Sequence, residues 1–195
     1  MPGPLALIAS VGLGYLLGSV PFGVLVTRLW RGVDVRSGGS GHTGGLNTIR
    51  MAGLLPGLIV AFADMGKAVV AVLIGQALDP SGWGAVLAGS AAIAGHCWPV
   101  FAGFRGGMGF ASGIAVLLYV RFWSVPILVL VFVAWLAVFR HFPRSQAATA
   151  ASMPAVLWVM GSEPPLLAFG FLAGGIVFLR HLHDLGRRKL TLGLR

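Results

Sequence analysis

Apolar residues run through this chain in long blocks rather than in the short periodic stretches of a water-soluble domain. About 20 consecutive apolar residues are the length that crosses a bilayer as a helix. The blocks therefore predict an all-α, polytopic membrane protein with about seven transmembrane helices. The predicted spans are residues 4–30, 54–78, 83–101, 109–120, 123–139, 147–160 and 165–179.

The charged residues between these blocks fall mostly on one side of the predicted membrane. The loops 31–53, 102–108 and 140–146 and the C-terminal tail share that side and hold nearly all arginines and lysines. Cytoplasmic loops of membrane proteins carry such an excess. The asymmetry predicts an N-terminus outside and a C-terminus in the cytoplasm. Because termini on opposite sides require an odd number of spans, the charges favour seven independently of the apolar blocks.

The composition also indicates a lipid environment. Hydrophobic residues make up 57% of the 195 positions and charged residues only 10%, against about 25% charged in soluble domains. A net charge of +9 suggests nucleic acid in a soluble protein. Here the basic residues lie at membrane-helix ends, where they set orientation and contact lipid headgroups. We therefore expect membrane lipids as partners and no nucleic acid.

The N-terminus and the single cysteine add two further expectations. Residues 1–4 lead into the first block without the basic segment of a cleaved signal peptide, so we interpret that block as the first span. Cys97 has no second cysteine to pair with, and its apolar surroundings predict a buried, inert thiol. No long linker interrupts the chain, so residues 1–195 are predicted to form one integral membrane domain.

Residues 36–50 form a glycine-dense segment that contains Ser40, His42, Asn47 and Arg50. Closely spaced glycines allow successive backbone N–H groups to converge on an anion. A serine hydroxyl and an arginine add donors that suit phosphate. A flexible solvent loop is the alternative, but this spacing of glycines between basic residues favours an anion site.

A second glycine-rich segment, residues 95–109, precedes the fourth predicted span. Gly106, Gly107 and Gly109 lie where the free N–H groups of a helix N-terminus could bind an anion. His96 ends an apolar block, where a histidine is a packing residue at least as often as a catalyst. No histidine spacing typical of a metal site and no nucleophile elbow is present, so we expect no metal and no cofactor.

Two pairs of ionisable residues lie within or just after apolar blocks. Asp64 and Lys67 are spaced to form an i, i+3 pair, and charges at membrane depth are normally paired. We favour a structural ion pair over a direct role in catalysis. His181 and Asp184 lie one turn apart and could face inward together. The basic residues 187–189 are predicted to anchor the chain at lipid headgroups.

Five segments together resemble the signatures of the bacterial acyl-phosphate:glycerol-3-phosphate acyltransferases, the PlsY family. They are residues 18–23, 39–50, 64–67, 95–109 and 180–181, and the resemblance covers nearly the whole chain. The resemblance implies a seven-span enzyme of the bacterial inner membrane, active at the cytoplasmic face and expected as a monomer. It implies transfer of a fatty acyl group from acyl phosphate to the 1-hydroxyl of glycerol 3-phosphate, giving lysophosphatidic acid.

The same resemblance implies which residues bind substrate, and it implies neither a metal nor a covalent acyl-enzyme. Catalysis would then rest on positioning and electrostatics, without an assigned catalytic residue. The implied substrate- and phosphate-binding residues are Ser40, Gly41, His42, Asn47, Arg50, Arg105, Gly106, Gly107, Met108, His181 and Asp184, supported by Asp64, Lys67 and His96.

The chain also departs from the family pattern at positions that matter for phosphate. The family usually has asparagine at His42 and Asp184, and lysine at Met108. One charged contact to phosphate is worth about 1.5–3 kcal/mol, roughly tenfold to a hundredfold in affinity. Arg105 is expected to compensate in part. Two hypotheses stay open: an acyltransferase with attenuated activity or an altered acceptor, or a non-catalytic membrane binding or regulatory protein. A transporter is disfavoured because the polar residues cluster at one face rather than at the midplane.

Overall fold

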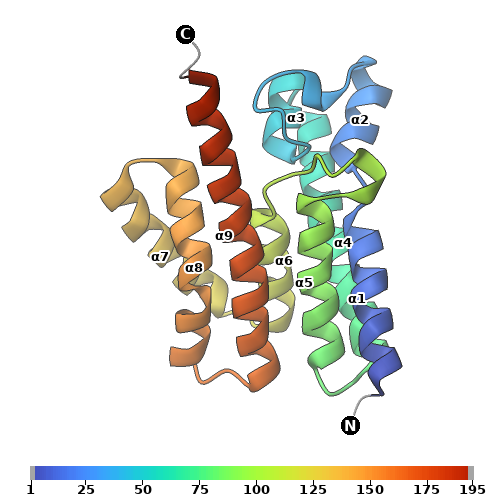
Figure 1. Ribbon diagram of the computed structural model, residues 1–195, viewed down its shortest axis with the longest axis vertical. Coiled ribbons are helices and arrows are strands. Elements are labelled where there is room, and N and C mark those ends of the chain that lie inside the picture. The colour runs from blue at the N-terminus through green and yellow to red at the C-terminus, as the bar shows by residue number, and fades with distance from the viewer. Residues whose placement is uncertain (1–2, 193–195) are drawn as a thin grey trace.

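The protein is all-helical, with most helices standing side by side in one bundle (Figure 1). The computed structural model describes residues 3–192, with side chains on the last helix up to Asp184. The predicted headgroup anchor, residues 187–189, lies outside the described side chains. In order, the helices are α1 (Pro4–Gly18), α2 (Phe22–Arg31), η1 (Val35–Ser37), α3 (Gly45–Ala52), α4 (Leu54–Leu78), α5 (Trp83–Cys97), η2 (Val100–Ala102), α6 (Phe110–Val120), α7 (Ser124–Phe139), α8 (Phe142–Val159) and α9 (Pro164–Leu192).

Four segments of the described chain are long and apolar enough to cross a membrane. They are residues 4–31, 54–78, 83–102 and 164–184. The apolar helices α6 and α7 have 11 and 16 residues, or about 16 and 24 Å of helix at 1.5 Å per residue. Both are shorter than the ~30 Å hydrocarbon core. Each predicted apolar block is thus confirmed as helical, while length and composition qualify four segments as spans.

The first predicted span is a broken helix rather than a continuous one. The chain leaves the helical conformation between α1 and α2, at residues 19–21. Pro21 has no backbone N–H to continue the ladder. The carbonyl of Val20 accepts a hydrogen bond from Lys67 Nζ at 2.8 Å. A lysine of α4 therefore stabilises the break in the neighbouring segment.

Two predicted boundaries were wrong in ways that affect the site. Residues 31–53 were predicted as a loop, but their second half forms α3, which packs against α4. The glycines and polar residues of this segment have low helix propensity, so the sequence did not indicate a helix. The short helix is stabilised by tertiary packing instead. The last span was predicted to end at residue 179. Instead α9 continues to Leu192, so Arg180, His181 and Asp184 lie on this helix.

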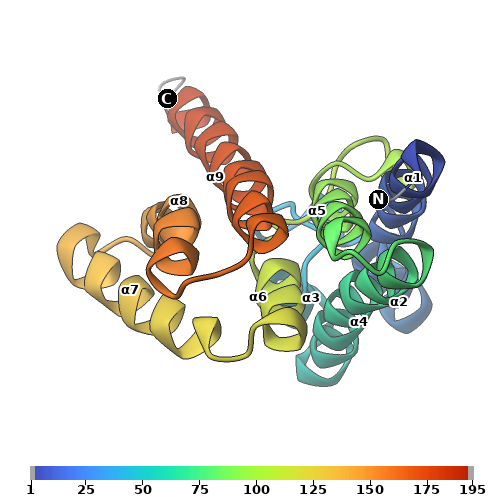
Figure 2. The ribbon, with the colours of Figure 1, turned by 90° about the horizontal axis from the view of Figure 1, so that it is seen from below.

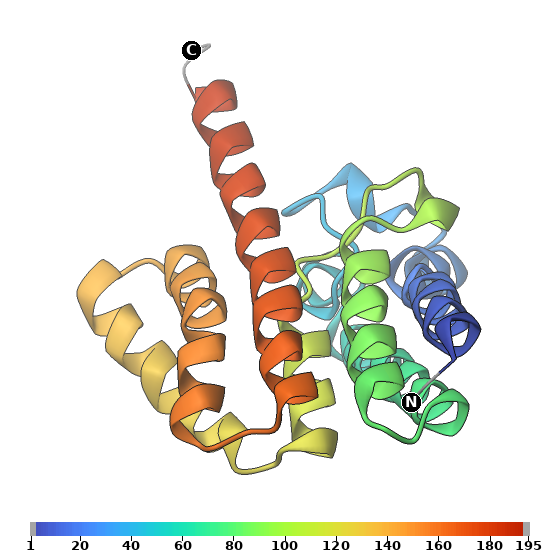
Figure 3. The same ribbon diagram turned by 60° about the horizontal axis from the view of Figure 1, so that its bottom comes forward.

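The helices form two groups, which α6 and the contact between α5 and α9 connect. α1, α4 and α5 pack together on one side, and α7, α8 and α9 on the other (Figures 2 and 3). In the first group α1 lies against α5 so closely that a β-carbon at Gly14 or Gly18 would collide with the backbone of Ala88 or Ala92. Small residues commonly allow this approach in membrane proteins.

Candidate substrate-binding site

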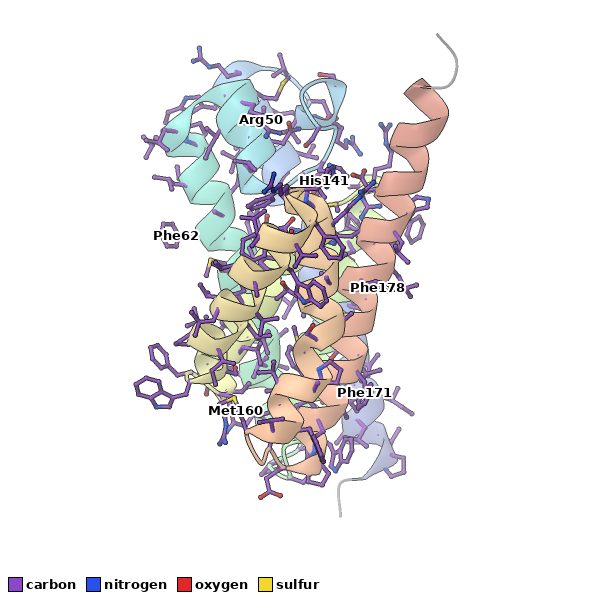
Figure 4. All side chains as sticks on the ribbon, turned by 90° about the vertical axis from the view of Figure 1, so that its left-hand side faces the viewer. Arg50, Phe62, His141, Met160, Phe171 and Phe178 are labelled. Carbon is purple, nitrogen blue, oxygen red and sulfur yellow. The ribbon has the colours of Figure 1, made fainter. Side chains whose placement is uncertain are left out.

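A cavity of about 640 Å³ lies toward the end of the bundle at which α9 finishes. Arg50 and His141 lie toward this end, and Met160 toward the opposite end (Figure 4). Pockets of this size commonly hold small-molecule ligands. The lining residues are Ser40, His42, Gly44, Gly45, Leu46, Asn47, Arg50, Ala61, Asp64, His96, Met108, Gly109, Phe110, Ala111, Phe142, Pro143, Gln146 and Asp184.

Asn47 fixes the shape of the glycine loop that forms one wall of the cavity. Its side chain is 2% exposed. Its Nδ2 donates to the carbonyls of Val35 at 2.8 Å, His42 at 3.0 Å and Gly38 at 3.2 Å, and its Oδ1 accepts from the Ser40 N–H at 2.8 Å. One buried amide therefore holds the turn at four backbone positions. Asn47 lines the cavity, but its hydrogen-bonding groups are directed to the loop.

The cavity presents donors that suit an anion. The Ser40 hydroxyl and the Arg50 guanidinium line it, and neither makes a hydrogen bond or ion pair elsewhere in the described chain. The N-termini of two helices also open onto it, α3 through residues 44–46 and α6 through residues 109–111. Helix N-termini carry partial positive charge and unpaired N–H groups. The cavity is therefore suited to binding a phosphate.

Two carboxylates also line the cavity, and each contacts a histidine. Asp64 Oδ1 lies 2.7 Å from Lys67 Nζ and 3.3 Å from His96 Nδ1, so the predicted pairing of Asp64 with Lys67 is confirmed. Asp184 Oδ1 lies 3.0 Å from His42 Nε2. Such pairing is expected, because an uncompensated charge is costly at these depths. Among the described residues that line the cavity, Arg50 is the only arginine or lysine.

Arg180 fixes the second glycine segment from the side of α9. Its side chain is 2% exposed, and it donates to the carbonyl of Gly107 through Nε at 2.9 Å and to that of Gly106 through Nη2 at 3.1 Å. The N–H of Gly107 donates to the His96 carbonyl at 3.0 Å. These glycines therefore bind protein groups, and Met108 and Gly109 form the adjacent cavity wall.

The loop between α2 and α3 is also tied to the α5–α6 connection. Asp34 accepts hydrogen bonds from the backbone N–H and guanidinium of Arg36 and from Arg28, and Arg36 Nη1 donates to the Ala102 carbonyl at 2.8 Å. The hydrogen bonds from Arg36 hold the pKa of Asp34 well below its ordinary value of 3.8. Asp34 therefore stays ionised at neutral pH and keeps its hydrogen bonds to Arg36, which contacts the α5–α6 connection.

A narrow apolar cleft of about 60 Å³ adjoins the cavity. Phe110 lines both, at the first position of α6. The cleft lies among α6, α7, α8 and α9. Its lining residues are Phe110, Gly113, Ile114, Leu117, Val125, Leu128, Val129, Phe132, Thr149, Ala150, Met153 and Val177. The cavity that the Ser40 and Arg50 donors line and the apolar cleft thus meet at the side chain of Phe110.

A family model described as glycerol-3-phosphate acyltransferase matches residues 8–189. The chain belongs to the glycerol-3-phosphate acyltransferase family. Similar members include enzymes of that name from Parasynechococcus marenigrum, 36% identical over 96% of this chain and 88% of the relative, and from Jannaschia sp., 38% identical over 90% and 85%.

Solved structures of a PlsY family member agree with this membership. A crystal structure of PlsY (YgiH), an integral membrane glycerol 3-phosphate acyltransferase, in its glycerol 3-phosphate form is 30% identical with a TM-score of 0.80. It matches over 94% of this chain and 92% of its own. The lysophosphatidic acid form of PlsY is 29% identical with a TM-score of 0.78.

The structure brings most of the predicted site residues of this family member to the cavity. Those that line it are Ser40, His42, Asn47, Arg50, Asp64, His96, Met108 and Asp184, and those that do not are Gly41, Lys67, Arg105, Gly106, Gly107 and His181. Arg105 is exposed. His181 is fully buried, and its Nε2 lies 3.2 Å from Oε1 of Gln146, which lines the cavity. His181 therefore contacts the cavity only indirectly, through the side chain of Gln146.

Among the lining residues that were not predicted from the sequence, three come from one segment: Phe142, Pro143 and Gln146. They belong to the first turns of α8, which was predicted to begin five residues later. A proline in the first helical turn is a typical start signal, and Pro143 provides it. This signal would have placed Gln146 on the helix, one position before the predicted start.

Proposed function

We propose that this protein transfers a fatty acyl group from acyl phosphate to the 1-hydroxyl of glycerol 3-phosphate, yielding lysophosphatidic acid for phospholipid synthesis. One observation carries the proposal: the cavity with the unpaired donors of Ser40 and Arg50 meets the apolar cleft at Phe110. A phosphate and an acyl chain can thus occupy adjoining spaces. Family membership supports the same reaction class.

The reaction needs little from the protein except position and charge. The acceptor hydroxyl oxygen attacks the acyl carbon, the bond from that carbon to the bridging oxygen breaks, and the departing phosphate takes the hydroxyl proton. Ser40, Arg50 and the N-termini of α3 and α6 would balance the phosphate charge. Holding both reactants in one cavity supplies much of the remaining acceleration.

The acyl chain would lie in the apolar cleft. Each buried CH₂ group contributes about 0.8 kcal/mol, so several methylenes beside Leu128, Met153 and Val177 would hold the donor. Binding energy from this remote chain would then orient the reacting carbonyl near Phe110.

We also propose that the chain is a single integral membrane domain, a monomer of the bacterial inner membrane, with seven passes. The N-terminus would be outside and the C-terminus and cavity in the cytoplasm. α1 begins and α9 finishes at opposite ends of the bundle (Figure 1), which supports an odd number of passes. The basic segments beside the cavity support a cytoplasmic location for that end.

Cysteine labelling of intact cells tests this orientation. Cys97 is buried and gives little background, whereas Ser37 and Glu163 are exposed. A membrane-impermeant thiol reagent should label Glu163→Cys in intact cells and Ser37→Cys only after lysis. The reverse result would reject the proposed orientation.

The activity test uses purified protein with palmitoyl phosphate and glycerol 3-phosphate. Lysophosphatidic acid should form, and Arg50→Ala should reduce kcat/KM by about 100-fold, because a charged contact to phosphate is lost. Arg31→Ala, an exposed arginine at the end of α2, is the matched control and should retain activity. Wild-type activity no higher than that of Arg50→Ala would reject the proposal.

An altered acceptor is the second candidate, because Met108 lines the cavity where the resembled family carries lysine. Wild type should then prefer another polyol phosphate, and Met108→Lys should raise the rate with glycerol 3-phosphate. A panel of polyol phosphates measures both effects. Product from no acceptor in that panel would favour a non-catalytic binding role.

A further inference from the structure

The end of α5 presents a histidine to the cavity, and a carboxylate contacts one nitrogen of its ring. His96 lines the cavity, and its Nδ1 lies 3.3 Å from Oδ1 of Asp64 on α4. We propose that the other ring nitrogen, Nε2, hydrogen-bonds a hydroxyl group of the acceptor, so that His96 selects a polyol phosphate over a phosphate without hydroxyl groups. This inference rests on the proposed function and deepens it, with His96 as a binding residue and Asp64 as a positioning residue.

Asp64 determines which nitrogen of the imidazole is available to a ligand. Its Oδ1 also lies 2.7 Å from Lys67 Nζ. A carboxylate oxygen beside a lysine is an acceptor, so Nδ1 carries the hydrogen that faces it. The ring makes no other hydrogen bond or ion pair in the described chain, and the side chain of His96 is 8% exposed. Nε2 is therefore the atom that His96 offers to the cavity.

Nε2 lies beside the segment that leads to the junction of cavity and cleft. A β-carbon on Gly107 would collide with it, and the Gly107 N–H donates to the His96 carbonyl at 3.0 Å. Met108 and Gly109, the next two residues, line the cavity, and Phe110 lines both the cavity and the cleft. With the acyl chain in the cleft, the attacking hydroxyl group must lie near Phe110. His96 is thus placed toward the hydroxyl end of the acceptor.

The pair of Asp64 and His96 differs in chemistry from the donors that suit phosphate. Ser40, Arg50 and the two helix N-termini offer N–H and O–H groups. Asp64 brings an acceptor instead, and its Oδ2 is buried without a hydrogen-bond partner among the described residues. A hydroxyl group both donates and accepts, so it can bind Nε2 whether His96 is neutral or charged. A phosphate dianion offers acceptors only and is repelled by a carboxylate. The pair therefore suits the hydroxyl end better.

Two amide substitutions separate the two nitrogens of the ring. In His96→Asn the short amide can take the place of Nδ1 beside Asp64, but nothing reaches the position of Nε2. In His96→Gln the longer amide reaches toward that position and can restore the contact. His183→Asn makes the same change on an exposed residue of α9 outside the cavity, and it is the control.

The measurement is the Kd by titration calorimetry of two ligands on the purified full-length protein. Glycerol 3-phosphate and propyl phosphate share three carbons and a phosphate, but propyl phosphate has no hydroxyl group. We expect wild type to bind glycerol 3-phosphate at least about fivefold more tightly. His96→Asn should bind both ligands with the affinity that wild type has for propyl phosphate, within about twofold. His96→Gln should keep a preference of about twofold or more, and His183→Asn should match wild type. KM for glycerol 3-phosphate should follow its Kd.

Three results would overturn the inference. Wild type would bind both ligands equally or neither of them. His96→Asn would keep the wild-type preference, or it would weaken propyl phosphate as much as glycerol 3-phosphate, as a structural role or a contact to phosphate predicts. His96→Gln, which also decides the question if His96→Asn does not fold, would bind both ligands equally.

The same experiments keep this inference apart from the proposed function. If the preference for hydroxyl groups is found and is lost in His96→Asn, but no lysophosphatidic acid forms, the proposed function fails and the assignment of His96 stands. If lysophosphatidic acid forms while His96→Asn behaves as wild type, the assignment of His96 fails and the proposed function stands.

Discussion

The cavity beside the glycine loop and the apolar cleft are built in different ways, although both are lined by Phe110. The cavity wall depends on single buried side chains, Asn47 and Arg180, each of which holds several backbone groups. The cleft is lined by side chains from four helices, and all but Thr149 are apolar or glycine. The Thr149 hydroxyl donates to the Ser145 carbonyl of its own helix rather than into the cleft. The geometry of the cavity wall therefore depends on a few hydrogen-bonding side chains, whereas the cleft depends on the packing of many apolar ones.

This difference suits two kinds of ligand. A phosphate requires donors at set distances and directions, so a lost anchor in the cavity should affect every acceptor. An acyl chain is bound in proportion to its buried area, so a change in the cleft should affect long chains and spare short ones. Substitutions in the two regions should thus differ in how much activity they remove. They should also differ in whether the loss depends on the length of the acyl chain.

The largest expected effect comes from Asn47→Ala. Removal of this amide leaves the Ser40 N–H and several loop carbonyls without their partner, which should lower the free energy of unfolding by about 2–4 kcal/mol. Activity should fall by about 100-fold with all donors. Unfolding in detergent and the acyltransfer assay measure both. Leu46→Ala, the exposed neighbour on α3, should cost no more than about 0.5 kcal/mol of stability. If Asn47→Ala were as stable as the wild type, Asn47 would not be the residue that holds the glycine loop in place.

Ser40→Ala should have the next largest effect. The hydroxyl is free in the described structure and available to a phosphate, and a hydrogen bond to a charged group is worth about 1.5–3 kcal/mol. KM for glycerol 3-phosphate should rise about tenfold or more, with little loss of stability. Ser37→Ala, on an exposed part of the same loop, should stay within about twofold. Equal KM values for both variants would remove Ser40 from the site.

Met153→Trp should alter the donor preference instead. The larger side chain would fill the cleft, so kcat/KM for palmitoyl phosphate should fall about tenfold while that for octanoyl phosphate changes less than about twofold. Val159 of α8 is 78% exposed, so Val159→Trp is the control for added bulk. A parallel loss with both donors would show that the cleft does not hold the chain.

The smallest expected effect concerns the hydrogen bonds between Asp34 and Arg36. Because the pKa of Asp34 is lowered from 3.8, its hydrogen bonds stabilise the folded loop above that pH and are lost as the pH falls through the lowered pKa. Hydrogen exchange at the Arg36 amide should therefore show unchanged protection from pH 5 to 8. In Asp34→Asn protection should be lower throughout. Loss of protection already at pH 6 in wild type would assign the effect to another group.

The helices could be predicted from the sequence where a segment is long and uniformly apolar. The span at residues 54–78 coincides with α4, because its 25 mostly apolar residues are enough to cross a bilayer as one helix. The sequence could not reveal α3, because this helix depends on a partner elsewhere in the chain. The break at residues 19–21 had a local signal in Pro21, but its stabilising partner is also distant in sequence. α3 packs on α4, and Lys67 stabilises the carbonyl at the break.

In the candidate site, too, local residue chemistry could be predicted from the sequence, whereas contacts between distant segments could not. Residue type indicated Ser40 and Arg50, because their chemistry alone suits phosphate. It did not indicate that Asn47 would be directed to its own loop, or that Arg180 would hold Gly106 and Gly107. The contact between His42 and Asp184 joins residues far apart in the chain, and no local pattern reports such a pair.

The most direct test of the account is to locate the acyl chain and the phosphate in one experiment. A palmitoyl phosphate analogue with a diazirine in mid-chain can be photolysed on the purified protein, and the labelled residues identified by mass spectrometry. We predict labels at Met153, Leu128 or Val177, and their loss in Arg50→Ala at the same donor concentration. Labels on the outer face of α7, at Leu130 or Val133, that persist in Arg50→Ala would contradict a joined cavity and cleft.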